Sequence, residues 1–163
     1  MSKECKTNAM RILERSHIPY EVIQYECKEF IDGIRVADQT GAPREQSFKT
    51  LVAKGRSGAH YVFVLPVELE VHLKSAARLV GEKSIEMLHV KDITTVTGYI
   101  RGGCSPLGMK KQYPTVIHET ARQYDKIYIS GGRIGTTIVV NPLQLAEVCQ
   151  AKFGNLTEDS GSL

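Results

Sequence analysis

Lys49 stands at a position where a charged side chain is costly. It lies in the apolar segment 48–53, and the alternation of side chains along a strand puts it on one face with Leu51 and Ala53. A lysine on an apolar face loses hydration unless it meets an anion or lines a wet cavity. The alternative is a lysine near a strand end whose stem carries the ammonium to solvent. The sequence leaves both interpretations open. If the side chain meets an anion or lines a wet cavity, Lys49 supplies the positive charge of a binding site.

Two glycine-rich segments have the composition of ligand-binding loops. Residues 98–108 read GYIRGGCSPLG, and residues 130–135 read SGGRIG. Glycine permits positive φ and close approach of a ligand, and successive glycines can turn their N–H groups toward an anion or a carbonyl oxygen. Neither segment has the spacing of a Walker or dinucleotide-binding loop. Each alone is consistent with a turn, but two in one small chain favour a pocket.

Protein nucleophiles and metal ligands are not indicated by spacing. Cys104 lies in the first glycine-rich segment, but no histidine is adjacent in sequence, so packing or a cavity wall is favoured over a nucleophilic role. The other cysteines and the histidines are scattered without CxxC, HxH or HExxH spacing. The sequence therefore predicts no metal site and no cofactor.

Length and composition indicate one globular domain. The chain has 163 residues, of which 42% are hydrophobic and 24% are charged, values typical of soluble domains. Its longest apolar run, residues 61–65, is far shorter than the roughly 20 residues of a spanning helix, and no secretion signal precedes it. These features predict a cytoplasmic protein, with one domain over residues 1–155 and an acidic, polar, frayed tail over residues 156–163.

The net charge of +3 predicts by itself an ordinary solvated surface. Its distribution is uneven, because residues 47–60 hold three basic residues and no acid, and residues 101–133 hold six basic residues against two acidic ones. The same segments carry the lysine and the glycine-rich loops. The basic excess therefore favours a local landing site for a polyanion such as the end of an RNA.

Secondary-structure patterns mix helices and strands without a strict βαβ alternation. Helical periodicity and capping residues predict helices over residues 8–16, 33–41, 68–80 and 90–96, and a final helix that begins at Pro142 behind an Asn141 cap. Strand patterns cover residues 20–25, 48–53, 60–65, 126–130 and 136–140. Two pairs of these strands read as hairpins. The predicted fold class is therefore α+β, with a mixed or largely antiparallel sheet.

Three ordered motifs resemble a known family. They are SFKTL at 47–51, TGYIRGGCSPLG at 97–108 followed by two lysines at 110–111, and YISGG at 128–132. Over roughly residues 5–155 the chain resembles the YbaK/EbsC family of trans-editing aminoacyl-tRNA deacylases, to which the editing domain of bacterial prolyl-tRNA synthetases is related. The resemblance implies a barrel-like sheet surrounded by helices.

The resemblance also implies site residues. Lys49 matches the lysine that the family needs for activity, and Gly102 and Gly103 match the loop whose backbone faces the ester. The implied substrate-binding residues are Tyr20, Phe30, Thr50, Ser130 and Thr137. Cys104 replaces an apolar residue expected in relatives, which weakens a catalytic role for its thiol.

The resemblance implies clearance of mischarged Cys-tRNA(Pro), with Cys-tRNA(Cys) as a further substrate. In the implied mechanism the cysteinyl thiol attacks its own carbonyl and the protein supplies orientation. The implied partners are the aminoacylated 3′ end of tRNA and prolyl-tRNA synthetase. Two alternatives remain: a non-catalytic RNA- or protein-binding regulator of the EbsC type, and a deacylase of another mischarged species such as Ala-tRNA(Pro).

Overall fold

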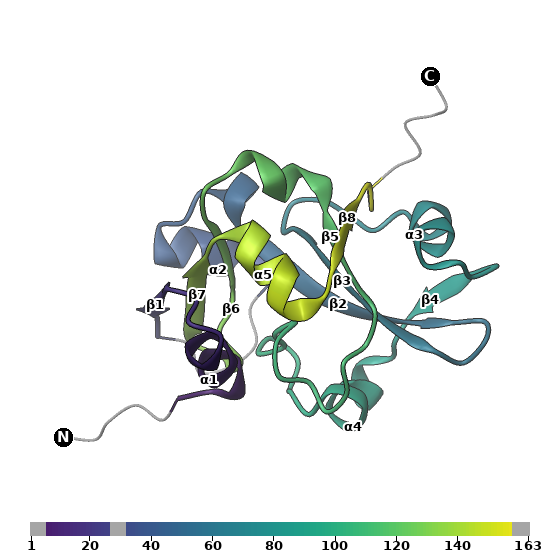
Figure 1. Ribbon diagram of the computed structural model, residues 1–163, viewed down its shortest axis with the longest axis horizontal. Helices are drawn as coiled ribbons and strands as arrows, with labels where there is room; N and C mark the ends of the chain where they lie inside the picture. The colour runs from purple at the N-terminus through teal and green to yellow at the C-terminus, as the bar shows by residue number, and fades with distance from the viewer. Residues whose placement is uncertain (1–5, 27–31, 158–163) are drawn as a thin grey trace.

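The computed structural model describes residues 6–26 and 32–157. Its strands form two sheets: in Figure 1 the three-stranded sheet stands at the left end, and the five-stranded sheet extends from the middle to the right. The three-stranded sheet has the order β1-β7-β6, with β1 at Tyr20–Gln24, β6 at Ile127–Ser130 and β7 at Thr136–Val140. The five-stranded sheet has the order β4-β2-β3-β5-β8, built from β2 (Phe48–Gly55), β3 (His60–Pro66), β4 (Ile85–Met87), β5 (Thr115–His118) and β8 (Lys152–Gly154).

Five α-helices accompany the sheets in the described residues. They are α1 (Asn8–Arg15), α2 (Gly33–Thr40), α3 (Leu73–Val80), α4 (Ile93–Thr97) and α5 (Pro142–Cys149). Short 3₁₀ turns lie at Arg44–Gln46, Val90–Asp92 and Glu119–Gln123. Thr7 and Asn141 cap α1 and α5 as the sequence predicts. None of the helices described is long and apolar enough to cross a membrane.

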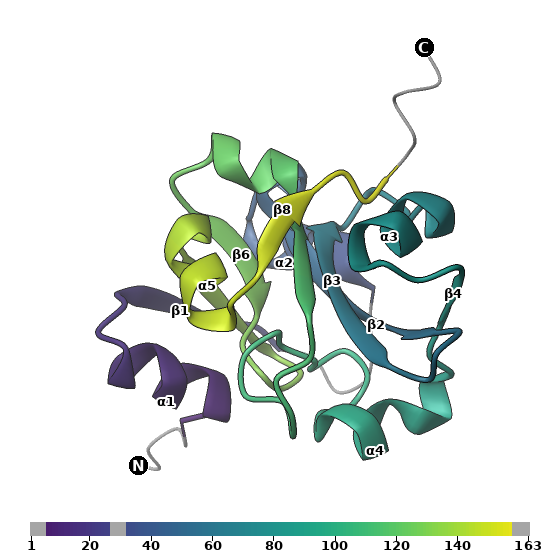
Figure 2. The same ribbon diagram turned by 45° about the vertical axis from the view of Figure 1, so that its right-hand side comes forward.

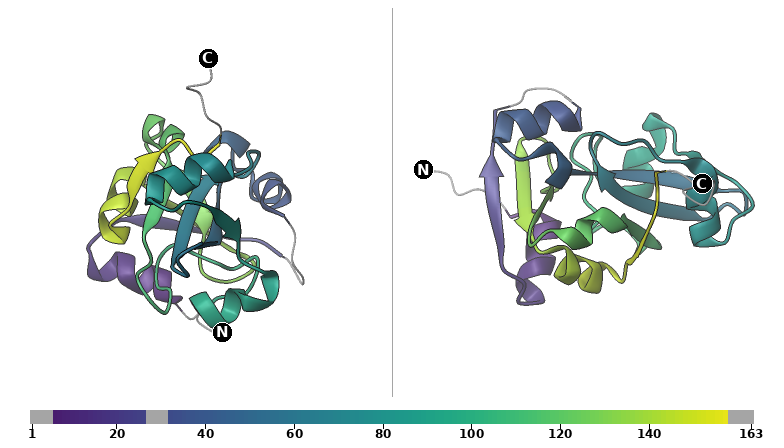
Figure 3. Two further views of the ribbon diagram at one scale, coloured as in Figure 1. Left: turned by 90° about the vertical axis from the view of Figure 1, so that its right-hand side faces the viewer. Right: turned by 90° about the horizontal axis from the view of Figure 1, so that it is seen from above.

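Strand pairing confirms the mixed, largely antiparallel sheet. Four of the six pairs between described strands are antiparallel, and β3–β5 and β5–β8 are parallel. The two sheets meet through an isolated parallel bridge between Ser47 and Tyr128. The expected barrel is therefore not closed. Seen from above, the three-stranded sheet stands at one end and the β2–β3 hairpin extends away from it (Figure 3).

The hairpin strand β3 divides the core into two clusters. Val62 and Val64 face a cluster that α1 and α5 complete. Phe63 and Leu65 face a second cluster that includes residues of α3. Burial on both faces confirms the prediction that the second strand of this hairpin is covered on both sides.

The predicted helix over residues 68–80 is shorter than expected, because α3 begins later. The N–H of Val67 donates to Ser47 O (2.8 Å), and the N–H of His72 donates to Leu156 O (2.7 Å). These tertiary hydrogen bonds hold the chain before α3 in an irregular path. Helical periodicity in the sequence does not report such long-range backbone bonds.

The strands β4, β5 and β8 were not predicted. β5 has four residues, all buried, and β8 has three. Figure 2 shows β8 alongside β5 after the chain has passed through α5. Strands this short carry little periodicity, and the parallel pairing of β5 with β3 and with β8 joins segments that lie far apart in the sequence.

The ordered body extends past the predicted domain limit at residue 155. Leu156 is fully buried, and its N–H donates to Nδ1 of His118 (3.0 Å). That bond assigns the proton of the neutral imidazole to Nε2. Residues 158–163 lie outside the described residues.

We expect stability to fall in acid through His118. Burial lowers the pKa of His118, so the unfolded chain takes up this proton first as the pH falls below the usual value of about 6.5. The protonated ring cannot accept from Leu156. Between about pH 7.5 and pH 5 the free energy of unfolding should therefore drop by about 1 kcal/mol, measured by urea titration. In His118→Asn, whose side-chain oxygen can accept without titrating, the drop should be smaller, and an equal drop would contradict this account.

Candidate active site

A cavity of about 570 Å³ lies along the first half of β2. Its walls come from α2, β2, β6, the start of α4 and the first glycine-rich loop. Among the described residues, β4 pairs with β2 only at Ala53–Gly55, and the isolated bridge between Ser47 and Tyr128 joins the start of β2 to β6. Between these contacts, side chains on both faces of β2 reach the cavity, including Lys49 and Thr50.

Lys49 is half-buried and lines this cavity. The pairing of Lys49 with Leu65 and of Leu51 with Phe63 confirms that the lysine shares its face with apolar residues. Its ammonium makes no hydrogen bond or ion pair with any described residue. Burial lowers the pKa of Lys49, and the carboxylates of Glu70 and Asp32 partly oppose that shift. The result is a cation that an incoming anionic or carbonyl group can meet.

Thr50 has an unmet hydrogen bond in the same wall. Its Oγ1 is buried and has no partner among the described residues. Buried hydroxyl groups are nearly always bonded, so this atom is a candidate for contact with a ligand.

The two glycine-rich loops contact each other. A Cβ at Gly103 would lie 2.8 Å from the Cα of Arg133 and 3.0 Å from the N of Ile134, so only glycine fits there without displacing backbone. The N–H of Gly103 donates to Ile100 O (2.9 Å). Gly102 lines the cavity at φ +88°, and its N–H has no acceptor among the described residues. The geometry thus separates two roles: Gly102 faces the cavity, and Gly103 lets the loops meet.

Ser130 and Thr137 form a cross-strand pair at the cavity. They lie opposite each other on β6 and β7, and both line the cavity. Ser130 Oγ accepts from the N–H of Gly132 (3.2 Å), and Thr7 Oγ1 donates to Gly131 O (2.6 Å). The cap of α1 thereby fixes the turn that follows Ser130.

Two predicted wall residues are not brought to the cavity by the described structure. Tyr20 is not among the lining residues, because its hydroxyl donates to Glu14 (2.6 Å) against α1. The nearby residue that does line the cavity is Tyr25, at the other end of β1. Placing Tyr20 in the cavity wall was therefore wrong. Phe30 lies outside the described residues.

Six charged or aromatic residues of the cavity were not predicted from the sequence. They are Tyr25, Asp32, Phe48, Glu70, Arg101 and Tyr128. Arg101 stands inside the first glycine-rich segment and Tyr128 inside the YISGG motif, so both could have been found there. Asp32 reads only as the cap of α2, and its Oδ1 accepts from Arg35 N (2.9 Å). Glu70 was hidden by the helix predicted over its segment.

Cys104 lines the cavity, but its thiol is poorly suited to be a nucleophile. Burial raises the pKa of Cys104 to about 11, so the thiolate is scarce near neutral pH. None of the described cavity residues is a histidine. The groups around the thiol include Val52 and Tyr99, with which it forms a small apolar cluster.

We therefore expect Cys104→Ala to keep more than half of the activity proposed below and to lose about 1 kcal/mol of stability. Steady-state rates and urea titration measure the two effects. Cys149→Ala is the matched control, because Cys149 is also buried but does not line the cavity. Complete loss of activity in a folded Cys104→Ala protein, with Cys149→Ala active, would indicate that Cys104 is the nucleophile.

The described residues contain no group of three or more histidine, cysteine, aspartate or glutamate side chains that could hold a metal ion. The polar groups that the cavity offers include the Lys49 ammonium, the Gly102 backbone and the hydroxyls of Thr50, Ser130 and Thr137.

Comparison with known proteins adds a family to this geometry. Residues 34–148 match the model of the aminoacyl-tRNA editing domain. The chain is 41% identical over 153 residues to a protein of Enterococcus faecalis named "Putative Cys-tRNA(Pro)/Cys-tRNA(Cys) deacylase EbsC", covering 93% of each.

Solved structures share the fold. The hypothetical protein APE2540 superposes with a TM-score of 0.83 at 20% identity, covering 91% of this chain and 97% of that one. A structure described as "a putative trans-editing enzyme for prolyl tRNA synthetase" superposes with a TM-score of 0.80 at 24% identity, covering 96% and 100%. With the family match over most of its length, the chain belongs to the aminoacyl-tRNA editing domain family.

Proposed function

We propose that this protein is a trans-editing deacylase that clears Cys-tRNA(Pro), and that Cys-tRNA(Cys) is a second substrate. The observation that carries the proposal is the half-buried Lys49 ammonium, unpaired among the described residues, in a cavity that Gly102 also lines. The Enterococcus relative, named for these two substrates, supports the choice of aminoacyl group.

The cavity supplies charge stabilisation for cleavage of an ester. As the carbonyl carbon is attacked, negative charge develops on the carbonyl oxygen. Backbone N–H groups and cations that already point at that position stabilise the charge without reorganising. The Gly102 N–H is the donor that the geometry leaves available. The Lys49 ammonium either joins it or holds the terminal ribose and phosphate of the tRNA.

The nucleophile in this proposal belongs to the substrate. The cysteinyl sulfur attacks its own carbonyl carbon, the bond from that carbon to the ribose oxygen breaks, and the proton of the thiol ends on that oxygen. The products are a tRNA with a free 3′-terminal ribose and a four-membered thiolactone. Such a route needs mainly orientation from the protein, which agrees with a raised Cys104 pKa and no histidine among the described cavity residues.

In this proposal a partner protein recognises which tRNA carries the cysteinyl group. The wall residues of one small cavity can contact the aminoacyl end, and the proposal gives recognition of tRNA(Pro) to prolyl-tRNA synthetase. Adding the synthetase should then raise the rate on Cys-tRNA(Pro) more than the rate on Cys-tRNA(Cys).

A panel of aminoacylated tRNAs tests the proposal. Cys-tRNA(Pro), Cys-tRNA(Cys), Ala-tRNA(Pro) and correctly charged Pro-tRNA(Pro) are incubated with the protein, with and without synthetase. We expect loss of the two cysteinyl esters and little change in the others. Preferential loss of Ala-tRNA(Pro) would favour the other editing specificity, and tight tRNA binding without any turnover would favour a non-catalytic regulator.

A further inference from the structure

A second, smaller cavity of about 180 Å³ lies in the segment between α4 and β5. Its walls come mainly from residues 106–113, with Ile12 of α1 and Val62 of β3. The only charged side chains among its described lining residues are those of Lys110 and Lys111. Without a carboxylate beside them, these two ammonium groups give the cavity a positive potential.

The neutral polar groups of this cavity are already bonded within the protein. Gln112 Nε2 donates to Cys149 O (2.8 Å), and the Tyr113 hydroxyl donates to Val96 O (2.7 Å). The Thr115 hydroxyl donates to Tyr113 O (2.9 Å). The two lysines, by contrast, form no ion pair or side-chain hydrogen bond with the described residues. The charged donors left for a ligand are therefore the two ammonium groups, which favour an anion.

Lys110 is partly held in place before a ligand arrives. Its backbone N–H donates to Thr97 O (3.0 Å). A Cβ at Gly98 would lie 3.2 Å from the Cγ of Lys110, so the lysine stem packs over that glycine. A side chain already packed along its stem loses less conformational freedom when its ammonium binds an anion.

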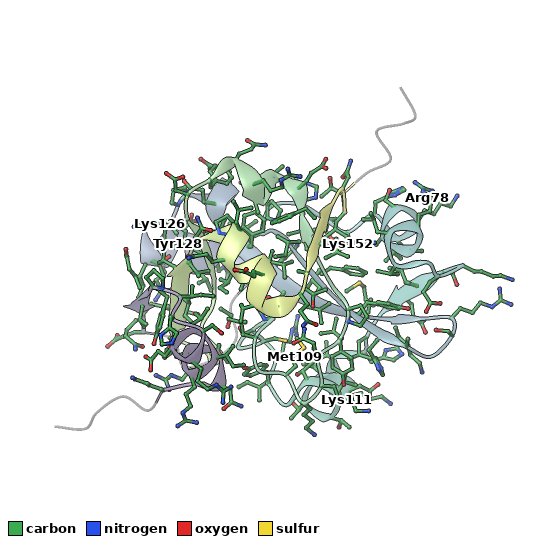
Figure 4. All side chains as sticks on the ribbon, viewed as in Figure 1. Arg78, Met109, Lys111, Lys126, Tyr128 and Lys152 are labelled. Carbon is green, nitrogen blue, oxygen red and sulfur yellow. The ribbon has the colours of Figure 1, made fainter. Side chains whose placement is uncertain are left out.

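One chain segment, residues 101–113, contributes lining residues to both cavities. Gly102 and Cys104 line the main cavity, and Lys110 and Lys111 line the small one a few residues later. Met109, between them, packs against the cluster that contains Cys104. Figure 4 shows Met109 near the middle of the molecule and Lys111 at its lower edge, away from Tyr128 of β6.

We propose that this lysine-lined cavity binds a backbone phosphate of the tRNA strand that leaves the main cavity, an inference that rests on the proposed function. A phosphodiester carries the single negative charge and the acceptor oxygens that two ammonium groups bind. Such contacts fix the register of an RNA on a protein without reading its sequence. Free inorganic phosphate has the same chemistry, and the experiment separates the two sources.

The test compares Lys110→Gln/Lys111→Gln with wild type on two substrates. One is full-length Cys-tRNA(Pro), and the other is the cysteinyl ester of adenosine, which has no backbone phosphate. We expect kcat/KM on the full tRNA to fall about tenfold, with the short substrate unchanged within about twofold. Lys83→Gln is the matched control, because Lys83 is exposed, has the same charge and lines neither cavity.

Binding of uncharged tRNA gives a readout that does not need catalysis. Across a salt series, the double variant should show a slope of log affinity against log salt that is shallower by about 1 to 2, since each lost phosphate contact removes roughly 0.7 to 0.9. Addition of inorganic phosphate should compete only weakly with tRNA. If the double variant shows this shallower slope but the wild-type protein cleaves no ester, the proposed function is wrong and the phosphate site is still supported.

Three results would overturn the phosphate site. The first is an unchanged tRNA affinity and salt slope in a folded double variant. The second is an equal loss on the short substrate, which would place the lysines in the catalytic cavity. The third is inorganic phosphate that binds at these lysines and is not displaced by tRNA, which would make the cavity a site for a free anion.

Discussion

Replacing Lys49 with methionine is expected to lower kcat/KM for Cys-tRNA(Pro) by about a hundredfold or more, the size of effect seen when one group that stabilises developing charge is removed. The fold should remain, because Lys49 makes no ion pair or hydrogen bond with described residues. Stability should stay constant or rise, since a half-buried cation without a partner is costly to fold. Single-turnover rates and urea titration measure the two effects on the same protein.

Lys54→Met is the control on the same strand, because Lys54 is exposed and does not line the cavity. It should keep the wild-type rate. A pH profile adds a second readout: burial lowers the pKa of Lys49, so the part of the rate that needs its charge should be lost, as pH rises, earlier than for an ordinary lysine. A Lys49→Met protein within threefold of wild type would remove this residue from the active site.

Removing the thiol from the substrate should have the second large effect. Ala-tRNA(Pro), or a tRNA charged with S-methylcysteine, should be deacylated at least about a thousandfold more slowly than Cys-tRNA(Pro), because neither offers a thiol held next to its own carbonyl. Alanine is smaller than cysteine and enters any pocket that holds cysteine, and an apolar pocket separates such analogues by only about 10- to 200-fold. Rates are measured under single turnover, so that chemistry is observed directly.

The S-methylcysteine ester separates chemistry from fit. It keeps the sulfur but has no thiol proton and is larger than cysteine, whereas alanine is smaller, so slow cleavage of both points to the thiol. Trapping with an amine, which converts the thiolactone to an amide, identifies the product that cyclisation of the cysteinyl group releases. Equal rates on all three esters would show instead that water is the nucleophile and that the protein activates it.

The sequence predicted those parts of the fold whose order is local. The β2–β3 and β6–β7 pairs, the caps at Thr7 and Asn141, and the face of Lys49 follow from side-chain alternation and capping residues. What escaped prediction depends on distant partners. β5 is recognisable only once β3 and β8 flank it, and the start of α3 depends on the hydrogen bond between His72 and Leu156.

The site followed the same division. Lys49, Thr50, Gly102, Ser130 and Thr137 all line one cavity, although their roles remain proposals. Gly103 follows Gly102 in the chain, and the backbone of Arg133 leaves no room for a side chain there. No spacing rule predicts that contact. Tyr20 does not line the cavity, because its hydroxyl donates to Glu14, six residues earlier. A wall residue placed by position alone therefore needs the tertiary structure to decide between neighbours such as Tyr20 and Tyr25.

Multiple turnover of Cys-tRNA(Pro) decides whether this protein is a deacylase. A large excess of the ester over protein is followed by acid precipitation of labelled cysteinyl-tRNA, beside a buffer control and the Lys49→Met protein. We expect many esters cleaved per protein molecule and a rate near that of buffer for Lys49→Met. Cleavage no faster than in buffer, with prolyl-tRNA synthetase also present, would contradict it.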